Sequence, residues 1–286
     1  MLFGECMQIN IELVTLGLIL ANFLVSVQGF SNLELRSKWV FRVDAILLGR
    51  EYHRLISGGF LHSGWPHLIF NMLTLYFFSS PLNQMALPSW YFLLIYFGSL
   101  LGGHLVALFL HRNHGDYAAL GASGAVNGVI FAAIALAPGI SVWFIPGWLF
   151  GILYLAGTIY GIRAQAGRIS HEAHLGGAIF GILAAILFRP TILVSHPLLL
   201  AALLIPAGVF LYLVYTRPEM LMIPGYFKGE ALKVKETIGK SNASKPKNDK
   251  FSSPEEEINH LLDKGLENLS NKERKRLEEL SRSLKE

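Results

Sequence analysis

The sequence has a single cysteine and few charged residues for its length. Cys6 has no partner for an intramolecular disulfide, and no Cys-x-x-Cys pair or Cys/His cluster has zinc spacing. Only 15% of the 286 residues are charged, against roughly 25% in soluble domains. The shortage lies in residues 1–216, whereas residues 217–286 are densely charged. We therefore expect a polytopic membrane domain followed by a soluble tail, with no metal ion and no cofactor.

Two further absences narrow the class of protein. The net charge of +4 is spread over loops and tail without a strong basic block, so nucleic-acid binding is not predicted. The first apolar run is preceded by no Lys or Arg and carries Glu12, which is unlike a signal peptide. We interpret it as a first membrane helix.

Apolar runs divide the chain into predicted spans. A membrane helix needs about 20 mostly apolar residues. Seven runs are of this kind: 11–27, 66–85, 89–110, 121–137, 143–162, 172–188 and 197–216. The sequence thus predicts an all-α membrane protein, with six helices in residues 1–190 and a seventh in residues 191–217. The loop between the first two spans mixes charged and aromatic residues and is expected to lie on the membrane interface.

The tail is predicted to hold a linker and a small helical unit. Residues 218–253 are largely polar and are typical of a flexible linker. Ser253-Pro254 followed by three glutamates is typical of a helix start, and Ser270 with Glu273 forms a capping box. We predict a two-helix hairpin over residues 254–286. Its apolar face is thin, so it is expected to pack on itself, on a protein partner or on the membrane surface.

Glycines recur at helical spacing in four of the spans. Pairs four residues apart lie on one helix face and let helices approach closely in lipid. The pairs are Gly98/Gly102, Gly124/Gly128, Gly157/Gly161 and Gly177/Gly181. Tight packing explains most of them. It also predicts that the helix beginning near Ser123 and the helix carrying His174 come close enough for their side chains to meet.

Four polar side chains lie where a membrane span makes them costly. His67 and Asn71 share one face of the second span, Ser123 opens the fourth, and His174 lies near the start of the sixth. Spans two, four and six cross the bilayer in the same direction. All four side chains are therefore expected at similar depth on the same side of the membrane.

This set has the parts of a Ser–His dyad. A serine hydroxyl becomes a nucleophile when a histidine takes its proton. The tetrahedral intermediate then needs hydrogen-bond donors, for which the Ser123 N–H, the His67 ring and the Asn71 amide are candidates. Glu172 lies two residues before His174, hence on another face, and is not expected to be a third member. Alternatively, Ser123 is a packing residue and the pair His67/Asn71 bonds helices together.

Neighbouring residues are given lesser roles. The small residues Gly121 and Gly124 keep the approach to Ser123 open, and Gly177 supports the close helix packing. Asn127, one turn below Ser123, is interpreted as a packing or hydrogen-bonding group. His62 and His171 are interpreted as solvated residues at the rim.

Several short motifs follow one another along residues 10–190. In chain order they are His53-Arg54, Gly59-Phe60-Leu61-His62, His67 with Asn71, Gly121-Ala122-Ser123-Gly124, and Ala173-His174 with Gly177 and Gly181. In these motifs and their order the sequence resembles the rhomboid family of intramembrane serine proteases. The resemblance implies Ser123 as nucleophile, His174 as general base, and His67 and Asn71 in the oxyanion site. It also implies cleavage of membrane-spanning helices near their ends, a cap over residues 163–170 and a lateral gate at the fifth span.

The sequence departs from the family pattern at two positions. Asn127 stands where family members often carry an aromatic residue that stacks on the catalytic histidine. His53 stands where the family usually has tryptophan.

Two alternatives to a protease have different sequence requirements. The orientation of the protein in the membrane is also left open by the sequence. A non-catalytic relative would bind transmembrane segments and control their trafficking or degradation, but such relatives usually lose Ser123 or His174. A transporter lacks support, because the mid-membrane charges and the inverted repeat expected of one are missing. In the usual family arrangement the site opens to the outside of the membrane. The distribution of Lys and Arg residues instead predicts that the side on which the site opens is cytoplasmic. The expected location is a bacterial inner membrane.

Overall fold

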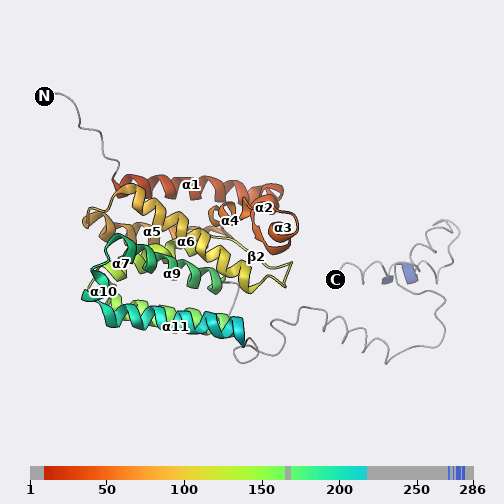
Figure 1. Ribbon diagram of the computed structural model, residues 1–286. Helices are drawn as coiled ribbons and strands as arrows, with labels where there is room; N and C mark the ends of the chain where they lie inside the picture. Colours follow the sequence, from red (N-terminus) through yellow and green to blue (C-terminus); the bar gives the residue numbers. More distant parts are fainter. Residues whose placement is uncertain are drawn as a thin grey trace, which may run out of the picture. The chain divides into compact units, whose positions relative to one another are not determined.

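The computed structural model describes residues 10–164, residues 169–217 and several positions between 270 and 280. The chain forms two compact units, Met1–Gly229 and Glu230–Glu286. The described residues of the first unit are mainly helical (Figure 1). Its elements are α1 Ile11–Ser31, α2 Leu33–Trp39, β1 Phe41–Arg42, α3 Val43–Leu47, α4 Arg54–Ser57, the 3₁₀ helix η1 Gly58–Phe60, α5 Trp65–Gln84, α6 Ser89–Leu110, β2 Ala118–Ala119, α7 Ser123–Leu136, β3 Ser141–Val142, β4 Ile145–Pro146, α8 Gly147–Ala164, α9 His171–Phe188, α10 Ile192–Ser195 and α11 Pro197–Thr216.

Each predicted apolar run is occupied by a helix, and two bounds differ by more than two residues. The first helix continues to Ser31 instead of ending at 27. The fifth begins at Gly147, not 143, because β3 and β4 form a hairpin there, with Trp143 and Phe144 at its tip, 88% and 98% exposed. Within the described residues α1, α6, α9 and α11 are long and apolar enough to cross a membrane, whereas α7 has only 14 residues. Spanning by α5, α7 and α8 stays a prediction.

Helix α7 forms the centre of the bundle. Every residue from Gly124 to Leu136 is buried, and α5, α6, α8 and α9 pack around it. A helix enclosed on all sides needs no polar face, which explains why its sequence is apolar or small all round. The core consequently surrounds the helix that Ser123 begins.

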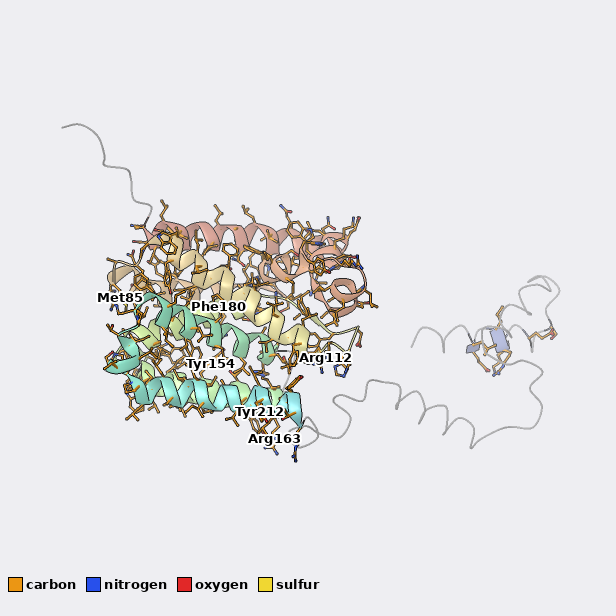
Figure 2. All side chains as sticks on the ribbon, viewed as in Figure 1. Met85, Arg112, Tyr154, Arg163, Phe180 and Tyr212 are labelled. Carbon is orange, nitrogen blue, oxygen red and sulfur yellow. The ribbon has the colours of Figure 1, made fainter. Side chains whose placement is uncertain are left out.

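The glycine faces are used as predicted in the contact of α7 with α9. A Cβ on Gly177 would overlap the Gly124 carbonyl oxygen, and a Cβ on Gly181 would overlap that of Gly128. The two backbones therefore touch, an approach that needs glycine. In α6 the small face instead receives the Phe180 ring of α9, labelled in Figure 2. The expectation fails at Gly157, where a Cβ would meet nothing within 4 Å.

The loop between α1 and α5 is anchored by Arg54. This buried guanidinium donates to the carbonyls of Ser37 (2.7 Å) and Val40 (2.8 Å) and pairs with Glu51 at 2.6 Å. His53 Nε2 lies 3.1 Å from the Lys38 carbonyl oxygen at the surface. The pair His53-Arg54 thus holds the loop through backbone carbonyls, with histidine in place of the family's tryptophan.

A short strand pair ties this loop to the segment before α7. β1 and β2 are antiparallel, with Phe41 opposite Ala119 and Arg42 opposite Ala118. The pairing ends two residues before Gly121, so the loop is fixed close to the start of α7.

The tail is described at a few positions only. Glu273 N–H donates to Ser270 Oγ (3.4 Å), and Ser270 N–H donates to Glu273 Oε2 (3.0 Å). These two bonds confirm the predicted capping box. The linker 218–253 and the predicted first helix of the hairpin lie outside the described residues.

Candidate active site

Ser123 is the first residue of α7 and is half-buried. The chain turns into the helix at Gly121, whose φ of +123° favours glycine, and Gly121 N–H is held by the Gly58 carbonyl oxygen at 3.0 Å. A Cβ on Gly121 would also lie 2.7 Å from His67 Cε1. The predicted supporting role of Gly121 therefore has two physical reasons, its backbone angle and the space it leaves for His67.

His174 lies at the same end of the neighbouring helix. A Cβ on Gly124 would be 3.3 Å from the Ala173 carbonyl oxygen, so the first turns of α7 and α9 are in contact. Ser123 precedes Gly124, and His174 follows Ala173. The structure therefore places the two predicted dyad residues on adjacent first turns, without a direct hydrogen bond between their side chains among the described residues. Such bonds are often long without substrate.

The hydrogen bonds of His67 make its Nε2 a donor. Ser63 N–H donates to His67 Nδ1 at 3.4 Å, and Ser63 Oγ lies 3.1 Å from the same nitrogen. Because a backbone N–H can only donate, Nδ1 must be the acceptor, and the ring proton of neutral His67 then sits on Nε2. That nitrogen faces the Gly121 backbone, two residues before Ser123. Its orientation suits an oxyanion donor.

The two asparagines bond to their own helices. Asn71 Nδ2 donates to the His67 carbonyl oxygen at 2.8 Å, and Asn127 Nδ2 donates to that of Ser123 at 2.8 Å. Each amide keeps a second N–H. Asn71 can therefore still serve an oxyanion, whereas Asn127 stabilises the first turn of α7. Asn127 Oδ1 is buried and has no hydrogen-bond partner among the described residues.

His62 is wrongly predicted as a solvated rim residue, because it is 1% exposed. Its Nε2 accepts the Ala122 N–H at 3.3 Å, and its Nδ1 lies 2.8 Å from Ser26 Oγ, which donates to the Phe60 carbonyl oxygen at 2.9 Å. These partners place the His62 proton on Nδ1 and link α1 to the residue before Ser123. Burial first, and His67 second, lower the pKa of His62 to about 3.

Acidification should destabilise the protein through His62. Above about pH 6.5 the ring is neutral in both states, whereas between about pH 6.5 and 3 only the unfolded chain takes up its proton. The free energy of unfolding should therefore fall as the pH falls through this window. His62→Gln, which keeps an acceptor for Ala122 and a donor for Ser26, should flatten the dependence of Tm on pH in detergent. The exposed control His53→Gln should leave it unchanged, and an unaltered slope in His62→Gln would contradict the assignment.

Glu172 belongs to a second buried cluster, which links the start of α9 to the segment after α6. Its carboxylate lies 3.2 Å from His111 Nε2 with both side chains buried, and the His111 ring stacks on Tyr117 at 3.6 Å. The Tyr117 hydroxyl lies 2.7 Å from Ser170 Oγ. Burial and the nearby Glu172 raise the pKa of Tyr117. Glu172 thus fixes the start of α9 to the segment after α6, consistent with the prediction that it is not a third catalytic member.

His171 is half-buried, and its ring packs against α8, where a Cβ on Gly161 would lie 2.5 Å from its Nε2. Within the described ranges no group of three or more His, Cys, Asp or Glu side chains could hold a metal ion.

The fold and the site define a polytopic helical membrane protein with serine and histidine at one end of two touching helices. The rhomboid domain family matches residues 49–191, half of the sequence. The chain belongs to the rhomboid family.

Individual relatives cover the same region. Over 193 residues the chain is 31% identical to RHOMBOID-like protein 12, mitochondrial, of Arabidopsis thaliana, covering 60% of this chain and 57% of the relative. Over 172 residues it is 31% identical to Rhomboid protein 1, mitochondrial, of Saccharomyces cerevisiae, with 56% and 49% covered. Over 168 residues it is 29% identical to Rhomboid protease GluP of Bacillus subtilis, with 58% and 32% covered.

The names of these relatives allow the predicted cellular location of the protein to be compared with theirs. The chain spans about half the length, or less, of the relatives it matches. Two of them are named as mitochondrial, so the comparisons do not support the prediction of a bacterial inner membrane. The multi-pass membrane class stands.

Proposed function

We propose that this protein is an intramembrane serine endopeptidase that cleaves transmembrane helices of other membrane proteins near the bilayer surface. The observation that carries the proposal is the contact of Gly124 with Ala173, which brings Ser123 and His174 to adjacent first turns. Membership of a family that includes a relative named as a protease supports it.

The proposed reaction follows from this arrangement. His174 Nε2 takes the proton of Ser123 Oγ as the oxygen attacks a peptide carbonyl of the substrate helix. The Ser123 N–H, His67 Nε2–H and the second N–H of Asn71 would stabilise the resulting oxyanion. Protonated His174 then gives its proton to the leaving amine as the peptide bond breaks. Water, deprotonated by the same histidine, hydrolyses the acyl-enzyme.

A transmembrane helix can be cleaved only if its peptide bond reaches Ser123. Ser123 is half-buried at the helix end, whereas Gly124 and Ala125 below it are closed off. The scissile bond would therefore have to unwind near the end of a substrate helix, which is the reason for proposing substrates with small or helix-breaking residues there. The predicted tail hairpin would bind a separate partner.

The test uses purified protein in liposomes with a panel of transmembrane substrates and a fluorophosphonate probe. We expect the wild type to cleave a substrate and to carry the probe on Ser123 by mass spectrometry. Ser123→Ala should do neither while keeping its Tm, and the exposed-serine control Ser195→Ala should behave as wild type. A folded wild type that is neither labelled nor active would refute the protease and favour a non-catalytic protein that binds transmembrane helices.

A further inference from the structure

Tyr154 of α8 lies against His174. Its hydroxyl oxygen is 3.3 Å from His174 Nδ1, and the two rings are nearly parallel, with centroids 6.4 Å apart and an interplanar angle of 29°. Figure 2 labels Tyr154 within the helical unit. The Tyr154 ring also packs against Phe131 of α7 and Phe150 of α8, with ring centroids 6.0 Å and 5.6 Å away. Tyr154 therefore occupies a packed, defined position beside the proposed base.

The chemistry of a Ser–His dyad determines which atom donates in the contact between Tyr154 and His174. For His174 Nε2 to accept the proton of Ser123, the ring proton of neutral His174 must sit on Nδ1. An acceptor beside Nδ1 fixes that tautomer, as a carboxylate does in a catalytic triad. Glu172 is engaged with His111 and is not available for this purpose. The Tyr154 oxygen is the acceptor that lies within reach.

We propose that Tyr154 is a positioning residue for His174: its hydroxyl oxygen accepts a hydrogen bond from Nδ1–H and so orients the base. This inference rests on the proposed protease function. It also accounts for Asn127, which stands where the family often has an aromatic residue. The aromatic side chain beside the histidine comes from α8 instead of from this position four residues after Ser123. Because Tyr154 belongs to α8, the placement of that helix sets the orientation of His174.

The test compares Tyr154→Phe with Tyr160→Phe in the liposome assay. Tyr154→Phe keeps the ring and removes only the hydroxyl, so kcat should fall about tenfold, the size of one lost neutral hydrogen bond, with KM and Tm unchanged. Tyr160 lies on the same helix, 69% exposed, and its change to Phe should leave kcat as in the wild type. An unchanged kcat in Tyr154→Phe, or a loss matched by a lower Tm, would overturn the proposal.

The wild type and Ser123→Ala are measured in the same assay to separate the two proposals. An inactive wild type refutes the protease. An active wild type together with a fully active Tyr154→Phe refutes only the positioning role.

Discussion

The His174→Asn variant should lose substrate cleavage by a factor on the order of 10⁴ while remaining folded. Asparagine fills much of the same space but cannot take up a proton, so the Ser123 hydroxyl would be left without a base. Helix α9 should form normally, because its contact with α7 is made by Ala173, Gly177 and Gly181, not by the histidine. The measurements are kcat/KM on a transmembrane substrate in liposomes, the rate of fluorophosphonate labelling at Ser123, and Tm.

His171→Asn is the matched control. His171 lies one turn earlier on α9, its ring centroid 5.9 Å from that of His174, and it is the nearby group that could take over as base. The control should keep most of its cleavage and labelling. If His171→Asn were inactive and His174→Asn active, the base would be His171, and the proposed geometry of the dyad would be wrong.

The helices and their closest contact follow from local sequence. A membrane helix satisfies its backbone within one segment, so a run of apolar residues is enough to predict it. The spacing of Gly124, Gly128, Gly177 and Gly181 likewise predicts backbone contact, since small residues four apart lie on one face. These two features, with the parity of the spans, are sufficient to predict that Ser123 lies near His174.

The polar partners of the site could not be predicted this way. His62 lies in a short loop and His111 at the end of α6, and nothing in the local sequence shows that tertiary packing buries one beside Ala122 and the other beside Glu172. Tyr154 is similar: within an aromatic-rich run it has no distinguishing neighbour in sequence. Its contact with His174 depends on the rotation of α8, which packing against α7, α9 and α11 determines.

Asn127 shows how a departure in sequence becomes informative once the fold is known. Taken alone, it removes the aromatic residue that the rhomboid pattern places over the histidine. In the structure its Nδ2 holds the Ser123 carbonyl, and an aromatic ring from α8 lies beside His174 instead. The aromatic contact of the histidine therefore comes from another helix than the family pattern predicts, and a position-by-position comparison with that pattern would miss it.

Gly177→Ala should be the most disruptive small substitution in the bundle. The added Cβ would overlap the Gly124 carbonyl oxygen, and neither backbone can move without separating α7 from α9. Overpacking of this kind costs about 1–3 kcal/mol. Because the first turns of the same two helices carry Ser123 and His174, a shift of about 1 Å would also slow cleavage roughly 100-fold.

Gly157→Ala separates this effect from a general intolerance of alanine for glycine. A Cβ at Gly157 would meet nothing within 4 Å, so this variant should keep the wild-type Tm and cleavage rate. For Gly177→Ala we expect a lower Tm in detergent together with slower probe labelling of Ser123. The two losses should appear together, because one backbone contact both holds the helices and sets the distance between nucleophile and base. A stable, fully active Gly177→Ala would mean that the helices can separate without moving the dyad, and that the contact carrying the proposed function does not position it.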